Sequence, residues 1–166
     1  AITMDGNGRW AESKGKLRVF GHKNGVKAVR DTVEAAAEIG IKFLTLYAFS
    51  TENWNRPKAE INALMSLLVS SINKETKTLM DNNIKLNTIG ATDNLPSKAK
   101  KELMEAVEKT KNNTRMTLTL ALSYSGRWEI LNAAKKMIVA KNNLKLFLDI
   151  FFITSHHFGF WHTNKS

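Results

Sequence analysis

Residues 43–56 read FLTLYAFSTENWNR, an apolar run followed at once by a polar loop. The length and the aromatic content of residues 43–49 predict a buried strand, with the loop at its carboxyl end. Three further apolar runs have strand character, at residues 1–4, 84–89 and 117–123. The wide spacing of these four runs leaves room for a helix between each strand and the next.

Helical patterns fill those intervals. The first repeats apolar residues from Val26 with a period of 3.6 residues until Gly40 ends it. Three more span residues 61–79, 97–109 and 128–141. Because strands that alternate with long helices pair in parallel through right-handed crossovers, we predict a single α/β domain. Its central, mainly parallel sheet is flanked by helices.

This topology tells us where to look for a ligand site. In an open sheet of parallel strands, ligands bind beyond the carboxyl ends of the strands. The segments expected there are residues 5–10, 50–56, 90–93 and 123–127. Two of these segments, 5–10 and 50–56, are rich in polar residues and tryptophan.

Composition excludes several classes of protein. The chain has 166 residues, of which 43% are hydrophobic and 24% charged, values that suit one folded domain and argue against disorder. The absence of cysteine excludes disulfides, iron–sulfur clusters and thiol catalysis, and it fits a reducing compartment. We see no transmembrane or signal-peptide pattern, so we expect a cytoplasmic location. The net charge of +10 suggests an anionic partner, although solvated helix faces would also account for it.

The first motif, MDGNGRW at residues 4–10, directly follows the first predicted strand. Its glycines let backbone N–H groups approach an anion closely, and Arg9 can donate paired hydrogen bonds to a phosphate. A carboxylate such as Asp5 beside a phosphate loop makes sense if a divalent cation lies between them. The alternative is a tight turn in which Asp5 caps a helix.

Two later segments could extend that anion site. Arg18 and His22 lie in a basic stretch near the start of a helix, where a lone histidine is more often a surface residue than a catalyst. The loop at residues 50–56 offers Glu52 as an acid and Arg56 as a phosphate ligand. Trp54 in that loop either contacts a ligand or packs as a wedge that holds the loop, because tryptophan is rarely left exposed.

Taken together, these motifs resemble the cis-prenyltransferase family of undecaprenyl diphosphate synthases. The matching stretches are DGNGRW at residues 5–10, GH at 21–22, STENWNRP at 50–57 and YSGRW at 124–128. The family elongates farnesyl diphosphate by successive condensations with isopentenyl diphosphate, and the long cis product becomes a lipid carrier for cell-wall sugars. The resemblance runs from about residue 2 to residue 144. We therefore predict an incomplete catalytic domain over residues 1–144 and an atypical apolar tail over residues 145–166.

The resemblance assigns a role to each matching residue. It implies that Asp5 is the Mg²⁺ ligand and the catalytic acid that assists departure of the diphosphate, and that Asn53 takes part in proton removal. The residues implied to hold the allylic diphosphate are Gly6, Asn7, Gly8, Arg9, Arg18 and His22. Further substrate-site positions are Trp10, Ser50, Thr51, Glu52, Trp54 and Arg56. The family also implies a homodimer without nucleic acid, which contacts the inner face of the membrane peripherally through its product.

The tail departs from the family pattern. From residue 146 onward only Asp149 and Lys165 are charged, and five of the eight phenylalanines and three of the four histidines lie there. Family members complete the isopentenyl diphosphate site with arginines and a serine, and a glutamate serves as their second Mg²⁺ ligand; none of these has a match there. Three functions therefore stay open: a cis-prenyltransferase, a non-catalytic subunit of the same fold, and a basic nucleic-acid-binding module. The intact motif from Asp5 to Arg9 favours the first, because a non-catalytic subunit would not need it.

We expect the 166-residue chain to bind farnesyl diphosphate but to elongate it little or not at all. The last arginine of the sequence is Arg127, so the second diphosphate lacks the strongest partners that the family provides. Titration calorimetry with each substrate, alongside incorporation of radiolabelled isopentenyl diphosphate, tests this expectation. Elongation at the rate usual for family members would contradict it.

Overall fold

The computed structural model describes residues 1–139. The elements follow one another as β1 (Ile2–Thr3), α1 (Asn7–Ser13), α2 (Arg18–Glu38), β2 (Phe43–Ser50), η1 (Thr51–Asn55), α3 (Lys58–Asp81), β3 (Ile84–Ile89), η2 (Thr92–Asn94), α4 (Ser97–Thr110), β4 (Met116–Tyr124) and α5 (Gly126–Val139). The chain forms two units, Ala1–Tyr124 and a second that starts at Ser125, of which α5 is the described part. The predicted end of the last helix at residue 141 and the tail predicted over residues 145–166 lie outside the described residues.

All four predicted strands are present, and they form one parallel sheet in the order β1-β2-β4-β3. Leu120 of the inner strand β4 lies opposite Leu46 of β2, and Leu118 lies opposite Leu86 of β3. Alternate residues of β2 point to opposite faces of the sheet, so that Leu46 is buried while Phe43 is exposed. The predicted α/β class and parallel sheet are thus confirmed.

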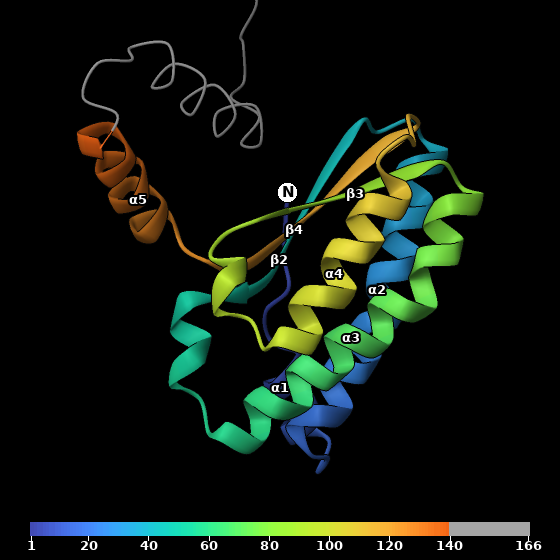
Figure 1. Ribbon diagram of the computed structural model, residues 1–166. Helices are drawn as coiled ribbons and strands as arrows, with labels where there is room; N and C mark the ends of the chain where they lie inside the picture. The colour runs from blue at the N-terminus through green and yellow to red at the C-terminus, as the bar shows by residue number, and fades with distance from the viewer. Residues whose placement is uncertain (140–166) are drawn as a thin grey trace, which may run out of the picture. The chain divides into compact units, whose positions relative to one another are not determined.

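Helices α2 and α3 pack side by side on one face of the sheet (Figure 1). Their apolar stripes meet the strands in one core, to which α2 contributes Val33 and Ala37 and α3 contributes Ile72 and Leu79. Pro57 directly precedes α3, where its fixed φ suits a helix start. No helix within residues 1–139 has a window apolar and long enough to cross a bilayer.

Helix α4 packs against the edge strand β3. The hydroxyl of Thr110, which is fully buried, accepts a hydrogen bond from the backbone N–H of Leu86 at 2.9 Å. Thr110 also donates to the carbonyl of Ala106 one turn earlier. Strand β3 therefore has a buried partner for a ladder donor that an edge strand would otherwise present to water or to another chain.

Aromatic side chains tie together the carboxyl ends of β2 and β4. The Tyr47 hydroxyl donates to the backbone carbonyl of Tyr124 at 2.8 Å, and the indole N–H of Trp54 donates to the Ser123 hydroxyl at 2.9 Å. The Trp54 ring also packs edge-on against Phe49, with ring centroids 4.8 Å apart. These contacts give Trp54 the loop-holding role that the sequence left open, and its contact with substrate stays a prediction.

Helix α1 approaches α2 so closely that only glycine fits between them. A Cβ atom at Gly21 would lie 1.9 Å from the backbone oxygen of Asn7, and one at Gly25 would lie 2.8 Å from the Asn7 Nδ2 atom. The chain enters α1 through Gly6, whose φ of 85° lies in the left-handed region that favours glycine. Two glycines of α2 and one turn glycine thus position the whole segment from Asp5 to Arg9.

We predict that Gly21→Ala destabilises the protein by about 1–3 kcal/mol or more, since the added methyl group collides with backbone rather than with a flexible side chain. Chemical denaturation followed by circular dichroism measures this change. The matched control is Gly126→Ala, where no atom lies within 4 Å of the added carbon. The control should stay within about 0.5 kcal/mol of the parent. Equal stability of the two variants would contradict the close approach of α1 to α2.

Candidate functional site

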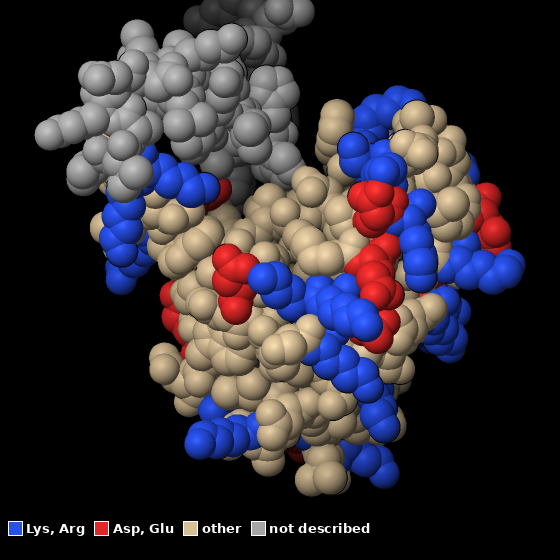
Figure 2. All heavy atoms as spheres, viewed as in Figure 1, with Lys and Arg blue, Asp and Glu red and all other residues tan. Residues whose placement is uncertain are grey.

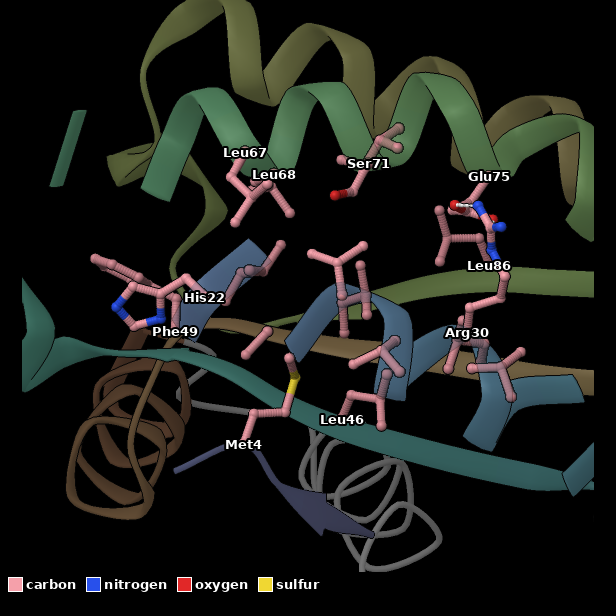
Figure 3. Close-up of a pocket in the computed structure, with 18 of the residues that line it drawn as sticks. Met4, His22, Arg30, Leu46, Phe49, Leu67, Leu68, Ser71, Glu75 and Leu86 are labelled. Atoms are coloured by element: carbon pink, nitrogen blue, oxygen red, sulfur yellow. Dashed lines mark hydrogen bonds and ion pairs between the residues drawn. The ribbon is translucent and has the colours of Figure 1, made fainter. Parts of the chain in front are cut away.

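A cavity of about 220 Å³ lies between α2, α3 and the helix-facing side of the sheet. Aliphatic side chains from both helices and from β2, β3 and β4 form most of its wall (Figure 3). His22 lies at one end of the cavity in Figure 3. Three more polar residues that the sequence singled out also line it: Asn7, Asn53 and Arg56. The cavity can thus hold an apolar chain whose polar head lies near His22.

The carboxylate of Glu60 lies close to three basic side chains, those of Arg18, His22 and Arg56. Glu60 accepts a hydrogen bond from Arg56 at 2.9 Å and a longer one from Arg18 at 3.4 Å. Its Oε1 atom also lies 3.6 Å from Nε2 of His22. Burial by itself would raise the pKa of Glu60, but the hydrogen bonds and charges of Arg18 and Arg56 outweigh it and lower that pKa. Glu60 is therefore ionised at neutral pH, and it joins α2 and the loop before α3 to the first turn of α3.

His22 is held in its neutral form. Its Nε2 atom is buried and is the one buried side-chain nitrogen or oxygen in the described part of the chain without a hydrogen-bond partner. Burial lowers the pKa of His22, the positive charges of Arg56 and Arg18 lower it further, and Glu60 opposes them. A neutral imidazole offers one donor and one acceptor. His22 therefore has hydrogen-bonding capacity to offer a ligand at this end of the cavity.

Arg18 bridges α1 and α3. Its Nη1 atom donates to both carboxylate oxygens of Glu12 at 3.1 Å, and its Nε atom donates to Glu60. The rest of the guanidinium lies against Gly8, where a Cβ atom would stand 2.8 Å from Nη2. The bond to Glu12 is the main cause of a raised pKa for Arg18. Arg18 is thus charged, oriented toward the glycine loop and already paired with two carboxylates.

Asp5 and Arg9 form an exposed pair on the glycine loop. The Arg9 Nη2 atom donates to Asp5 Oδ2 at 3.0 Å, and Asp5 Oδ1 accepts from the backbone N–H of Gly6 at 2.6 Å. The two side chains are 74% and 72% exposed for Asp5 and Arg9 respectively. An exposed pair of this kind contributes only about 0–1 kcal/mol to stability, so a ligand can separate the two side chains at little cost.

The loop after β2 brings its polar groups to the same cavity. Asn53 lines the cavity, and its Oδ1 atom accepts a hydrogen bond from the backbone N–H of Ser50 at 3.0 Å. Its amide NH₂ group is then the part that it can offer to a ligand. Thr51 and Glu52 begin η1 and are not among the cavity-lining residues.

Trp10 lies apart from the cavity. Its ring stacks on Phe20 with centroids 6.1 Å apart, and Lys14 lies 5.5 Å from its face. Trp10 is 44% exposed. Its predicted contact with substrate therefore has no support in the cavity wall and stays a prediction.

The sequence prediction did not include Glu60 or Glu12. Glu60 follows Arg56 by four residues, the spacing at which side chains of opposite charge meet on a helix, and it lies in the first turn of α3. That spacing could have indicated the pair with Arg56. Nothing local could have indicated the contacts of Glu60 with Arg18 and His22, because both belong to another helix.

On one face of the molecule, the charges support solvated helix faces as the explanation of the net charge. On the face shown in Figure 2, acidic side chains lie among the lysines and arginines. Surface pairs of opposite charge include Lys77–Asp81 at 2.8 Å and Lys100–Asp93 at 2.7 Å. Interleaved charges of both signs are typical of solvated helix faces, whereas nucleic-acid sites gather basic side chains on one surface.

Comparison with known sequences identifies close relatives. A family model described as undecaprenyl diphosphate synthase matches residues 3–158. The ditrans,polycis-undecaprenyl-diphosphate synthase of Pasteurella multocida, named as specific for (2E,6E)-farnesyl diphosphate, is 52% identical over 149 residues, which cover 90% of this chain and 62% of that protein. An isoprenyl transferase of Clostridium tetani is 56% identical over 137 residues, which cover 82% of this chain and 54% of that protein. The chain thus spans little more than half the length of these relatives.

Comparison with solved structures gives the same family. Lavandulyl diphosphate synthase from Lavandula x intermedia, solved in complex with dimethylallyl diphosphate, matches with a TM-score of 0.81 and 32% identity over 83% of this chain and 59% of that one. A probable undecaprenyl diphosphate synthase from Campylobacter jejuni matches with a TM-score of 0.66 and 38% identity over 71% of this chain and 58% of that one. The named relatives are enzymes, which favours the first of the three functions that the sequence left open.

We predict a specific dependence of stability on pH from His22. Because burial lowers the pKa of His22 in the folded protein, the unfolded chain takes up that proton first as the pH falls. The parent should therefore lose free energy of unfolding relative to His22→Asn as the pH drops through and below about 6.5. Urea denaturation of both proteins at a series of pH values measures the difference. Parallel curves between about pH 7 and pH 5 would contradict a buried neutral His22.

Proposed function

Because this chain belongs to the undecaprenyl diphosphate synthase family of prenyltransferases, we propose that it forms the farnesyl-diphosphate-binding part of an enzyme that condenses this allylic substrate with isopentenyl diphosphate. The product of the complete reaction is a long cis-polyprenyl diphosphate, the lipid carrier for cell-wall synthesis. The observation that carries the proposal is the apolar cavity, whose wall includes His22 and Arg56 beside the glycine loop. An allylic diphosphate needs both a dry apolar channel and a cationic site for its head group.

The glycine loop and the start of α2 supply the diphosphate site in this proposal. Arg9 is exposed and held only by Asp5, so it can turn to a phosphate oxygen. Arg18 points its Nη2 atom toward Gly8 while its other nitrogens bind carboxylates. Backbone N–H groups of Asn7 and Gly8 add further donors, and that of Gly6 would join them once it is released from Asp5 Oδ1. These groups together favour a dianionic or trianionic ligand.

The donor set around Asp5 fits Mg²⁺ when the substrate is present. Residues 1–139 contain no cluster of three or more acidic or histidine side chains that could bind a metal without help. Mg²⁺ is commonly held by one or two carboxylates together with substrate phosphates and water. Asp5 is an exposed carboxylate on the loop that would meet the diphosphate, so it would be the protein ligand. Mg²⁺ held there would neutralise part of the negative charge of the diphosphate.

The reaction requires the diphosphate to leave an allylic carbon, and negative charge then grows on its oxygens. Arg9, Arg18 and the loop N–H groups would donate hydrogen bonds to those oxygens, and loss of one such donor typically costs about 10²–10³ in rate. The neutral His22 can donate a hydrogen bond to the same oxygens. Asn53 lines the cavity near His22 and Arg56, where the diphosphate end of the substrate would lie. The resemblance to the family associates Asn53 with proton removal from the condensing substrate.

The remaining proposals follow from the family. We infer a homodimer in the cytoplasm that meets the inner face of the membrane through its apolar product. A long apolar product would expose its hydrocarbon chain to water if it were released into solution. This unfavourable exposure favours transfer of the product directly to a bilayer. Flotation with vesicles in the presence and absence of product would test the membrane contact.

We predict that Arg9→Gln and Arg18→Gln each weaken binding of farnesyl diphosphate by about 1.5–3 kcal/mol, the range for a hydrogen bond to a charged group. Binding of farnesol, which lacks the diphosphate, should change little in either variant. We also expect Mg²⁺ to tighten farnesyl diphosphate binding in the parent and to have no such effect in Asp5→Asn. Titration calorimetry of the 166-residue chain measures all three quantities.

The matched control is Arg115→Gln. Arg115 precedes β4 at the amino-terminal edge of the sheet, away from the strand ends at which the site is built. This variant should bind farnesyl diphosphate like the parent. Equal losses for farnesol and farnesyl diphosphate in the Arg9 and Arg18 variants would mean that these arginines support the fold, and the proposed diphosphate site would be wrong.

A further inference from the structure

Three large apolar side chains lie on the surface where α1 ends and α2 begins, at the blue end of the chain in Figure 1. Leu17, in the turn between the two helices, is 81% exposed. Trp10 and Phe20 stack on each other, and their side chains are also exposed. Leu17 and Phe20 are three residues apart at the start of α2, so they lie on one face of that helix. These side chains form an apolar surface that the fold itself does not cover.

Three exposed lysines surround this apolar surface. The Lys14 ammonium group lies 5.5 Å from the centre of the Trp10 ring. Lys16 directly precedes the exposed leucine in the turn. Lys23 follows Phe20 by three residues on α2, which makes the two side chains neighbours on the helix surface. We define the α1–α2 corner as the apolar and basic side chains of Trp10, Lys14, Lys16, Leu17, Phe20 and Lys23.

The acidic side chains nearest to the corner along the chain are already paired with arginines. Glu12 accepts two hydrogen bonds from Nη1 of Arg18, each at 3.1 Å. Asp5 accepts one from Nη2 of Arg9 at 3.0 Å. Because these carboxylates and arginines compensate each other, the lysines give the corner a positive charge around an apolar centre.

A bilayer with anionic lipids fits this combination better than a protein or a nucleic acid does. Tryptophan, phenylalanine and leucine beside lysines are typical of surfaces that lie in the membrane interface, where the rings enter the lipid and the ammonium groups meet phosphates. Lysine is depleted in protein–protein interfaces, which argues against a protein partner. The exposed side chain of Leu17 gives a nucleic acid nothing to bind.

We propose that the α1–α2 corner docks the protein on a bilayer that contains anionic phospholipids. The side chains of Trp10 and Leu17 enter the interface, and the lysines bind lipid phosphates. The protein makes this contact itself, without substrate or product, so the inference goes beyond the membrane contact through the product that is part of the proposed function. Arg9 directly precedes Trp10, so docking would hold the glycine loop near the lipid phosphates.

The first experiment uses the absence of cysteine from the chain, which allows one dye to report on one position. Leu17→Cys, labelled with the environment-sensitive dye NBD, is mixed with vesicles of phosphatidylcholine and phosphatidylglycerol, and no substrate is added. The NBD emission should rise and shift to the blue, because the dye passes from water into the apolar part of the interface. The matched control is labelled Ile39→Cys. Ile39 is 77% exposed at the other end of α2, and the dye there should stay in water.

The second experiment measures cosedimentation of unlabelled protein with the same vesicles. Lys14→Gln/Lys16→Gln should lower the partition coefficient at least about tenfold, because each lysine near an anionic surface adds to the attraction. Lys98→Gln/Lys109→Gln removes the same charge from α4 and should bind like the parent. Leu17→Ser should weaken binding at least about fivefold through the lost apolar contact. Serine suits the position before the first residue of a helix, so this variant should keep the start of α2 intact.

Two results would overturn the proposal. The first is an NBD response at position 17 that is absent or no larger than the response at position 39. The second is equal binding by the Lys14/Lys16 and the Lys98/Lys109 variants. Residues 140–166 are identical in all of these proteins, so they cannot account for a difference between variants.

Inorganic polyphosphate tests whether the corner binds any polyanion. It offers charge without an apolar phase, so it should cause no blue shift of the dye at position 17. A shift as large as that with vesicles would show that a bilayer is not the specific partner, and the proposal would be wrong. Binding of farnesyl diphosphate is measured in solution without vesicles, so the docking surface and the proposed function can fail independently of each other.

Discussion

The close approach of α1 to α2 is the constraint on which the site depends. Because no Cβ atom fits at Gly21, the backbone of Asn7 can lie directly against α2. This contact brings the segment from Asp5 to Arg9, which follows the edge strand β1, to the start of α2, where Arg18 and His22 lie. The carboxyl ends of β2 and β4 then supply the second side of the site, through the loop that Trp54 and Ser123 hold. A loop rich in glycine thus gains its order from packing against a helix rather than from its own side chains.

The arginines of the site are already paired with carboxylates in the absence of a ligand. Arg18 binds two carboxylates, Arg56 shares one of them, and Arg9 is paired with Asp5. Compensation of this kind avoids leaving three arginines without partners near a buried histidine. A diphosphate must compete with these carboxylates, so its net gain is smaller than the count of cations suggests. The arrangement favours ligands of high negative charge, which can compete with a single carboxylate for the hydrogen bonds of an arginine.

Two groups of charged side chains lie along the cavity, and they differ in what they leave available to a ligand. Near the glycine loop, burial, with a smaller effect from Arg56 and Arg18, lowers the pKa of His22, whose Nε2 atom has no hydrogen-bond partner. Farther along the two helices α2 and α3, Arg30 and Glu75 satisfy each other with two hydrogen bonds. The walls between them are aliphatic side chains that also form the core of the fold. The same residues therefore stabilise the domain and define the space for an apolar chain.

The sequence by itself determined the α/β class, the four strands, the four longer helices and the family, because these depend on local periodicity and on motifs of adjacent residues. It did not predict the short helix α1 (Asn7–Ser13) as a separate element. It also indicated the glycine loop and the segment from Ser50 to Arg56 as the places where chemistry would lie, since loops follow the ends of strands. Only the tertiary structure decided that Trp10 stacks on Phe20 away from the cavity and that Trp54 holds its loop. It also decided that Glu60 binds Arg18 across 42 residues of chain and that Glu75 binds Arg30 across 45. Pairs so distant in sequence leave no local pattern, because their contact is set by how two helices pack on one sheet rather than by the residues beside them.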